Sequence, residues 1–597
     1  MLASRRRFAL GAAILAAPLA LLGPVRAAHA ATQVVNSVAA LQAALNSAAP
    51  GDVIQLADGT YSTSSVITVN RSGTAAAPIV VQAQHVGGAQ LSGSGGFSLG
   101  SGASYVVLSG FRFTGSRGLE VPVGADHVQI THNVFQLAGS VKYWLVVSGD
   151  DAEVDHNTFQ HKSTIGNFVE VVGPGSSGMA QRTWIHHNYF LDHSYTGSNG
   201  GESIRVGLSG RQHSSAHALV ENNLFERCNG DLEVISVKSS DDIIRYNTLR
   251  NSKGTITLRH GWGSLVEGNF LLGNSTGIRM FGNNHTVVNN VVQSSTGLAL
   301  EVGGGEVRDD TTSGTNHEAV DHALVAFNTF VNDKSSPIQV GDGGKDFQPT
   351  DVTVANNIVS GSGSAVSLKG GSGLRYQGNI LNGVTGGSMP SSGYTTVNPQ
   401  LVQDAAGLYR LAAGSPAIDA ALGSYPQINL DMDGQVRGGA KDVGADEVGP
   451  GALREPLTAA DVGPGSSGSG SVVRYEAEGA TISQGAVATN HTGYSGAGFV
   501  DYTNIVGGYL EWSVDAASAG STALAIRFAN GTTVNRPMDI AVNGVVVAAG
   551  LGFGPTANWD TWQTTSLTVP LNSGANTIRA TATTANGGPN VDYIEVG

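Results

Sequence analysis

Residues 243–292 read IIRYNTLRNSKGTITLRHGWGSLVEGNFLLGNSTGIRMFGNNHTVVNNVV. One short motif, Asn-x-apolar, occurs three times in this stretch, at Asn247, Asn269 and Asn290, and each copy follows a short β-branched or apolar segment. The copies are 22 and 21 residues apart. A short unit of this kind, repeated at a nearly fixed period, is typical of a solenoid.

The motif extends well beyond this stretch in both directions. It occurs at Asn133, Asn157, Asn188, Asn223, Asn247, Asn269, Asn290, Asn328, Asn357 and Asn379. The shortest steps are 21 to 24 residues, and the longer ones, up to 38, indicate loop insertions. Because the units are β-branched and alternating, they favour strands. We therefore predict an all-β, right-handed parallel β-helix in which the Asn side chains stack into a hydrogen-bonded ladder.

The composition agrees with a turn-rich β protein. The chain has 597 residues, of which 83 are Gly and only 13% are charged, which argues against coiled coils and long surface helices. The formal net charge of −14 counts against a nucleic-acid partner, because phosphate recognition needs a basic surface.

The first thirty residues have the pattern of an export signal. Arg5, Arg6 and Arg7 precede an apolar run, and Ala28-His29-Ala30 gives a small-x-small cleavage pattern. We predict a twin-arginine signal peptide over residues 1–30 and a periplasmic or extracellular protein. No membrane association is expected once the signal is removed, because no other stretch is apolar for long enough.

The rest of the chain divides by composition. Residues 31–448 are expected to form the β-helix domain, with closing turns from about residue 398 that cap its open end. Residues 449–471 are rich in Gly, Pro and Ser and predict a flexible linker. Residues 472–597 contain alternating strands without the Asn repeat and are expected to form a β-sandwich of the jelly-roll type.

Charged residues gather in one part of the repeat. Lys238, Arg259 and Arg279 lie nine, ten and eleven residues before the next repeat Asn, so Lys238 and Arg259 should be near neighbours on one face, with Arg279 on the next coil. Asp231 and Glu233 precede Lys238 on its coil. A locally basic strip dotted with carboxylates fits an extended anionic substrate. Asp231, Glu233 and Asn199 offer hard oxygen donors that suit Ca²⁺.

The same residues carry a family resemblance. The segments Asn199-Gly-Gly-Glu202-Ser-Ile-Arg205, Glu233-Val-Ile-Ser-Val-Lys238, Arg259-His260-Gly and Gly277-Ile-Arg279 resemble polysaccharide lyase family 6, the alginate lyase and chondroitinase B family. The resemblance covers roughly residues 32–448 and implies a right-handed parallel β-helix. It assigns Lys238 as catalytic base, Arg259 as catalytic acid, and Asn199, Asp231 and Glu233 as calcium ligands. The family usually has Glu where this chain has Asp231.

The activity implied is β-elimination of a uronate-containing polymer, with His260, Arg279 and Arg205 binding substrate. Alginate is the first expectation, because no sulfate-specific pattern is visible and the export signal looks bacterial. Three alternatives stay open: a dermatan sulfate lyase within the family, a β-helix hydrolase such as a polygalacturonase, and a non-catalytic polysaccharide-binding adhesin.

The last segment resembles carbohydrate-binding modules of families 6 and 35. The segments that carry the resemblance are Tyr475-Glu476-Ala-Glu478, Tyr494-Ser-Gly, Trp559-Asp-Thr-Trp562 and Asn590-Val-Asp592. The resemblance places a sugar on Tyr494, Trp559 and Asn590, since a sugar face stacks well on a large ring. It also implies a structural Ca²⁺ held by Glu476, Glu478 and Asp592.

Overall fold

The computed structural model describes residues 32–75, 77–309, 314–334, 337–449, 453–466, 473–495, 498–516, 520–572 and 574–596. The predicted signal peptide, residues 1–30, lies outside these ranges. Within them, no helix is both long enough and apolar enough to cross a bilayer.

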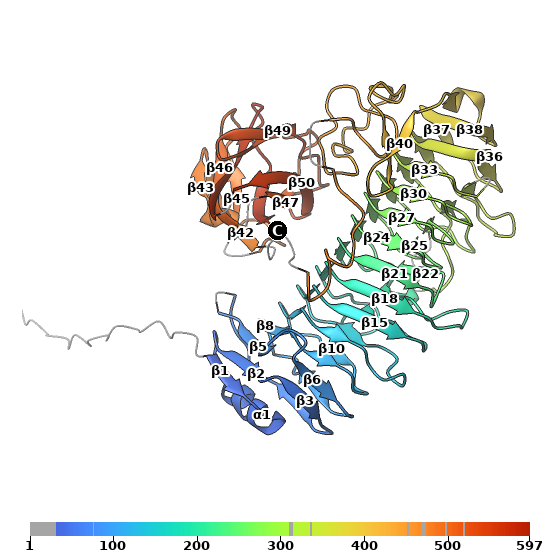
Figure 1. Ribbon diagram of the computed structural model, residues 1–597. Helices are drawn as coiled ribbons and strands as arrows, with labels where there is room; N and C mark the ends of the chain where they lie inside the picture. The colour runs from blue at the N-terminus through green and yellow to red at the C-terminus, as the bar shows by residue number, and fades with distance from the viewer. Residues whose placement is uncertain are drawn as a thin grey trace, which may run out of the picture.

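The first unit is a parallel β-helix, as predicted (Figure 1). Its coils present three faces. The first face is a parallel sheet made of β1 (Thr32–Val35), β2 (Val53–Leu56), β5 (Ile79–Ala83), β8 (Val106–Ser109), β11 (Gln129–Thr131), β14 (Glu153–Asp155), β17 (Trp184–His186), β20 (Leu219–Glu221), β23 (Ile243–Arg245), β26 (Leu265–Glu267), β29 (Thr286–Val288), β32 (Leu324–Ala326), β35 (Thr353–Ala355) and β37 (Arg375–Gln377). We call this sheet face A.

The other two faces belong to one continuous sheet that bends around the coil. Face B contains β3 (Gly59–Ser62), β6 (Ala89–Ser92), β9 (Arg112–Phe113), β12 (Val134–Phe135), β15 (Thr158–Lys162), β18 (Tyr189–His193), β21 (Leu224–Cys228), β24 (Thr248–Arg250), β27 (Phe270–Leu272), β30 (Val291–Gln293) and β33 (Thr329–Val331). Face C contains β10 (Leu119–Val121), β13 (Leu145–Val147), β16 (Val169–Val171), β19 (Ile204–Val206), β22 (Glu233–Val237), β25 (Thr255–Leu258), β28 (Ile278–Met280), β31 (Leu300–Val302) and β34 (Ile338–Val340). Strand β36 (Ile358–Leu368) runs across both, and β38 (Asn379–Gly387) and β39 (Tyr394–Thr396) follow it.

The predicted asparagine ladder is present between faces A and B. Each of the ten repeat Asn residues is fully buried. Within a step, the backbone N–H and the side-chain Nδ2 of one Asn donate to Oδ1 of the next, as from Asn223 to Asn247 at 3.0 Å each. The series runs without a break from Asn133 to Asn379. The ladder therefore satisfies buried backbone donors at every turn.

The residue before each ladder Asn has a left-handed backbone. His156, Tyr246 and Phe327, for example, have φ of 50°, 55° and 55°, and Gly268 occupies the same position at 61°. A left-handed residue costs about 1–2 kcal/mol when it has a side chain. The ladder holds even bulky residues in this conformation, which is a direct consequence of its hydrogen bonds.

The interior of the helix is filled by stacked side chains. The rings of Phe113, Phe135, Phe159, Phe190 and Phe225 follow one another at centroid distances of 4.7 to 5.2 Å. The N-terminal end is covered by α1 (Val38–Ser47), whose N-cap Ser37 accepts a hydrogen bond from the Ala40 N–H. Leu41, Ala44 and Leu45 of this helix are buried against the first coil.

Residues 398–449 do not cap the open end as expected. They lie along face B, where Leu408, Met432 and Ala445 pack against Phe270 and Val291. The apolar side chains on the outside of β27 and β30 need a cover, and this segment supplies it. It includes the short hairpin β40 (Leu401–Gln403) and β41 (Tyr409–Leu411).

Residues 453–466, part of the expected linker, also lie on the β-helix. The Leu457 N–H donates to Thr248 Oγ1 at 2.9 Å, and the Gly463 N–H donates to the His187 carbonyl at 2.9 Å. Arg454 stacks over the Tyr246 ring at 4.0 Å. We call residues 453–466 the strap.

The C-terminal unit is an antiparallel sandwich of two sheets. One contains β42 (Val473–Glu476), β44 (Gly485–Ala488), β45 (Phe499–Tyr502), β47 (Gly520–Ala529), β50 (Gln563–Leu571) and β52 (Asn590–Val596). The other contains β43 (Thr481–Ser483), β46 (Tyr509–Ala516), β48 (Met538–Val542), β49 (Val545–Leu551) and β51 (Gly574–Ala582).

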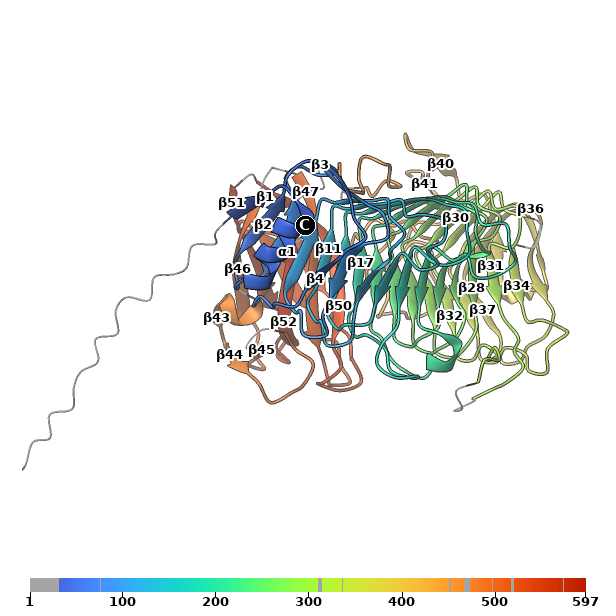
Figure 2. The same ribbon diagram turned by 90° about the horizontal axis from the view of Figure 1, so that it is seen from below.

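The sandwich lies against face A of the β-helix (Figures 1 and 2). Trp184 and Glu221 of the β-helix line one cleft together with Ala525, Leu567 and Glu595 of the sandwich. Further contacts join Asn429 Nδ2 to the Gly552 carbonyl at 3.0 Å and bring Leu430 into the sandwich core. Later parts of the chain therefore cover stretches of faces A and B, and face C carries the charged residues described next.

Candidate active site

Lys238 and Arg259 lie side by side on face C. Val237 of β22 pairs with Leu258 of β25, and Lys238 and Arg259 are the next residues of the two strands. Arg279 lies on the following coil, inside β28, where it pairs with Thr257. All three residues therefore lie on neighbouring coils of one face, as predicted from their spacing. Arg279 is aligned with Thr257, two residues before Arg259, and so does not stack directly on Arg259.

Glu233 holds the two guanidinium groups together. Arg259 Nη1 lies 2.6 Å from Glu233 Oε1, and Arg279 Nη1 lies 3.8 Å from the same oxygen. The Ser236 hydroxyl donates to Glu233 Oε2 at 2.6 Å. The carboxylate is almost fully buried, so these charge-assisted contacts fix its orientation.

The Lys238 ammonium is buried next to Glu202. Its Nζ lies 3.4 Å from Glu202 Oε1, and the lysine side chain is 9% exposed. Burial lowers the pKa of Lys238 below its ordinary value, and Arg205 and Arg259 lower it further, against the opposing effect of Glu202 and Glu233. The lowered pKa makes the neutral amine, which is the form that can accept a proton, easier to reach than in an exposed lysine.

The predicted calcium ligands are brought together only in part. The Asp231 carboxylate accepts hydrogen bonds from the Glu233 N–H at 3.2 Å and from the Gly201 N–H at 3.3 Å. Burial and the neighbouring Glu202 raise the pKa of Asp231. Asn199 is exposed in the loop that leads to Gly201, and among the described residues it makes no hydrogen bond to either carboxylate. The carboxylate oxygens of Asp231 and Glu233 are hard donors of the kind that Ca²⁺ prefers, although Glu233 already pairs with Arg259.

Arg205 and His260 occupy different environments at this site. Arg205 pairs with Glu170 at 2.5 Å and lies 3.4 Å from the Tyr143 hydroxyl. His260 is fully buried, and neither ring nitrogen has a hydrogen-bond partner within the described part of the chain. Burial lowers the pKa of His260 to about 3, so the ring is neutral.

Two neighbours of these residues were not predicted from the sequence. His317 comes from the insertion between β31 and β32, and its ring stacks on Phe281 at 4.2 Å and lies 5.4 Å from the His260 ring. Glu202, the partner of Lys238, belongs to the predicted motif at residues 199–205, but the sequence assigned it no role. The long step of 38 residues from Asn290 to Asn328 marked the insertion that carries His317, but insertion length alone does not say which residue returns to the site.

The sandwich residues predicted to bind sugar lie at one end of that unit. Tyr494 and His491 both contact Phe499, with ring centroids 5.6 and 5.7 Å away, and His491 lies 6.1 Å from Trp559. Asn590 begins β52, next to the strand that contains Phe499.

Two of the three predicted calcium ligands of the sandwich, Glu476 and Asp592, accept hydrogen bonds from Ser495. The Ser495 hydroxyl donates to Glu476 Oε2 at 2.8 Å, and its N–H donates to Asp592 Oδ1 at 2.8 Å. Burial, followed by the charges of Asp592 and Glu478, raises the pKa of Glu476 to about 7. Asp592 also pairs with Arg527, which already offsets part of the negative charge.

Fold and site together define a parallel β-helix protein with a strip of charged residues across face C, followed by a separate antiparallel β-sandwich. The chain belongs to the Chondroitinase B family, whose family model matches residues 35–371, and a carbohydrate-binding module of family 35 matches residues 473–597. The second match narrows the earlier resemblance to families 6 and 35.

Solved structures and curated proteins give the same division. The β-helix is similar to the alginate lyase AlyGC of polysaccharide lyase family 6, with 29% identity, a TM-score of 0.59, and coverage of 64% of this chain and 55% of that one. It is also similar to a mannuronic acid specific family 6 lyase from human gut microbiota, with 26% identity, a TM-score of 0.55, and coverage of 61% and 90%.

The curated relatives match a short part of the chain, about as long as the sandwich. The exo-beta-D-glucosaminidase of Amycolatopsis orientalis is 53% identical over 132 residues, which is 22% of this chain and 12% of that protein. Endo-1,4-beta-xylanase B of Cellvibrio japonicus is 41% identical over 113 residues, 19% of each. The chain therefore spans less than a fifth of the length of these two curated relatives.

Proposed function

We propose that this chain is an exported polysaccharide lyase that cleaves a uronate polymer, alginate first, by β-elimination. The observation that carries the proposal is the pair of Lys238 and Arg259 on adjacent coils, with the lysine buried and its pKa lowered. A hydrolase would need a carboxylate pair as acid and base, whereas here Glu233 pairs with Arg259 and Glu202 contacts the Lys238 amino group.

In the proposed reaction, neutral Lys238 Nζ takes the proton from C5 of the uronate. The electron pair of that C–H bond forms the C4=C5 double bond, and the bond between C4 and the bridging O4 breaks. Arg259 stabilises the negative charge that develops on O4, and a proton reaches O4 through water, because arginine does not readily give up its own. Arg205 and Arg279 supply positive charge for substrate carboxylates along face C.

Ca²⁺ held by Asp231, Glu233 and Asn199 would supply positive charge to the carboxylate of the cleaved uronate. The protein's part is to present those oxygens beside Lys238. Glu233 would then contact both the ion and Arg259, so its orientation matters to both.

Alginate is preferred over dermatan sulfate because family 6 relatives of more than 25% identity include an alginate lyase and a mannuronic acid specific lyase. The sandwich is proposed to bind polymer through Tyr494, Trp559 and Asn590, and to hold the lyase near its substrate.

One assay separates the alternatives. Mature protein is incubated with alginate, polymannuronate, polyguluronate, pectate and dermatan sulfate, with and without a chelator, and ultraviolet absorbance is followed. Elimination creates a conjugated alkene that absorbs, hydrolysis gives reducing ends without absorbance, and an adhesin gives neither. Lys238→Ala should abolish alkene formation, while Lys369→Ala, which changes an exposed lysine at the end of β36, should not. Full alkene formation by Lys238→Ala would show that Lys238 is not the catalytic base. Full activity after complete chelation would show that the reaction does not use Ca²⁺.

A further inference from the structure

Face A carries a column of buried polar residues, although it is the outer side of the coil. Val154 and Ile185 point into the core, so their neighbours Asp155 and His186 point outward. Successive coils pair Thr131, Asp155, His186, Glu221 and Arg245 in register. Asp155 and His186 are 3% and 1% exposed. The sandwich covers this part of face A, with Glu595 of β52 among the residues that face it.

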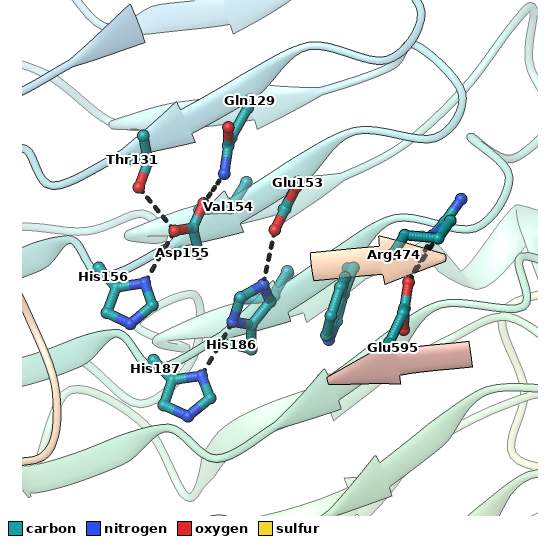
Figure 3. Close-up of polar contacts among 12 residues, drawn as sticks. Gln129, Thr131, Glu153, Val154, Asp155, His156, His186, His187, Arg474 and Glu595 are labelled. Carbon is teal, nitrogen blue, oxygen red and sulfur yellow. Dashed lines mark hydrogen bonds and ion pairs between the residues drawn. The ribbon is translucent and has the colours of Figure 1, made fainter. Parts of the chain in front are cut away.

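Glu153, Asp155 and His186 converge at the edge of this covered area (Figure 3). His186 Nε2 lies 3.0 Å from Glu153 Oε1. One carboxylate oxygen from each acid and one nitrogen of His186 all lie within 4.8 Å of one another. Three side chains so arranged can reach one ion at metal–ligand distances of about 2.0–2.2 Å.

The surrounding residues fix the orientation of these three. Asp155 accepts hydrogen bonds from Gln129 Nε2 at 3.0 Å and from the Thr131 hydroxyl at 2.6 Å, and His156 Nδ1 lies 2.8 Å from it. The second nitrogen of His186 lies 2.9 Å from His187 Nδ1. Metal-binding sites show this kind of outer support, in which neighbouring polar groups orient the ligands.

The two acids of this cluster differ from the neighbouring acids in the side chains with which they pair. Glu221 pairs with Arg245 at 2.6 Å and Glu595 pairs with Arg474 at 2.6 Å. Within the described ranges, Glu153 and Asp155 make ion pairs only with imidazoles and none with Lys or Arg, while Asp155 also accepts the hydrogen bonds from Gln129 and Thr131. The Asp155 side chain is buried and that of Glu153 is partly exposed, so a positive charge near them lowers the cost of holding the two carboxylates together.

We propose that Glu153, Asp155 and His186 form a binding site for a divalent transition-metal ion of the Zn²⁺ type, at the junction of the β-helix and the sandwich. An ion with two positive charges would neutralise both carboxylates. The mixture of an imidazole nitrogen and carboxylate oxygens suits Zn²⁺ better than Ca²⁺ or Mg²⁺, which prefer oxygen alone. The site is separate from Lys238 and Arg259, which lie on face C. A bound ion should stabilise this part of face A, since its ligands come from two neighbouring coils beside the area that the sandwich covers.

The test uses mature full-length protein with saturating Ca²⁺, so that oxygen-only sites are filled. After removal of transition metals, Co²⁺ is titrated as a spectroscopic probe and then displaced by Zn²⁺. We expect one equivalent of Co²⁺ per chain with visible absorption bands, and loss of these bands on addition of Zn²⁺. His186→Gln and Asp155→Asn should abolish the bands. His85→Gln, which changes an exposed histidine paired with Asp58, is the matched control and should keep them.

A second readout is thermal unfolding with and without Zn²⁺. An ion that binds only the folded protein raises the unfolding midpoint, and the rise should be seen in wild type and His85→Gln but not in His186→Gln. The absence of a zinc-displaceable Co²⁺ spectrum in the wild type overturns the proposal and leaves protons on the imidazoles to balance the charge. His132, Asp155 and His156 form a neighbouring group that shares Asp155. Full binding by His186→Gln, or loss of binding in His132→Gln with His186→Gln unaffected, overturns the assignment of these ligands. The wild-type titration decides the question even where a variant does not fold.

Discussion

Arg259 and Glu233 form a direct ion pair of 2.6 Å across neighbouring coils of face C. The pair places a residue assigned as catalytic acid in contact with a residue assigned as calcium ligand. Any change in one of them therefore moves the other, and the two proposed roles are linked by geometry.

The first prediction concerns this pair. Glu233→Gln keeps the shape but removes the charge that orients Arg259, so kcat/KM on alginate should fall by about 100-fold or more. Glu301→Gln removes a partner of Arg279, at 3.4 Å, but leaves the Arg259–Glu233 pair in place, and serves as the control with a small effect. Equal effects of the two substitutions would contradict a special role for Glu233.

The second prediction concerns pH. The carboxylate of Glu202 raises the pKa of Lys238, because it favours the charged ammonium. Glu202→Gln removes this effect, so the lysine loses its proton at lower pH. The ascending limb of the kcat/KM profile should then shift toward lower pH. An unchanged limb, measured in the same buffers on protein of verified fold, would show that Lys238 is not the titrating base.

The third prediction concerns His317. Its Nε2 is buried and has no hydrogen-bond partner among the described residues, and its ring stacks on Phe281. His317→Phe keeps an aromatic ring and removes the nitrogen. We expect KM to rise roughly fivefold, which corresponds to the loss of one neutral hydrogen bond to substrate. The change in kcat should be smaller. His322→Phe, at an exposed position, is the control. Unchanged KM in His317→Phe would mean a purely structural ring.

The fourth prediction concerns the ladder. Asn223→Ala removes the acceptor of the Asn188 N–H and three donated bonds, and leaves buried backbone groups unpaired. The free energy of unfolding should fall by about 3 kcal/mol, measured by denaturant titration. Asn46→Ala, on the exposed side of α1, should change it by less than about 0.5 kcal/mol. Comparable losses in both variants would mean that the ladder adds no stability of its own.

The fifth prediction concerns the sandwich. Trp559→Ala should weaken retention on gelled alginate while kcat on soluble oligomers stays unchanged. Val545→Ala, at an exposed strand position of the same unit, should leave both the retention and kcat unchanged. If Trp559→Ala is retained as well as wild type, this tryptophan does not hold the sugar.

The fold could be predicted because the ladder Asn occupies the same position on every coil and therefore recurs at a nearly regular interval in the sequence. Lys238 and Arg259 could be placed for the same reason, since their distance from the ladder gives their position on the coil. The position of residues 398–449 could not be predicted. Apolar residues such as Leu408 and Met432 indicate that this segment packs against another part of the chain, but they do not indicate which face of the β-helix that is. His317 and the junction at Asp155 and His186 depend on contacts between segments far apart in sequence, which leave no periodic trace.

The strap has a consequence for how the two units work together. Leu457 and Gly463 are hydrogen-bonded to coils of the β-helix, and the sandwich that follows rests on face A. A module on a free tether samples many positions, and its benefit falls gradually with tether length. Here the sugar-binding end would keep a fixed direction relative to Lys238. The gain from the module should then depend steeply on polymer length, and vanish for oligomers too short to reach both places at once.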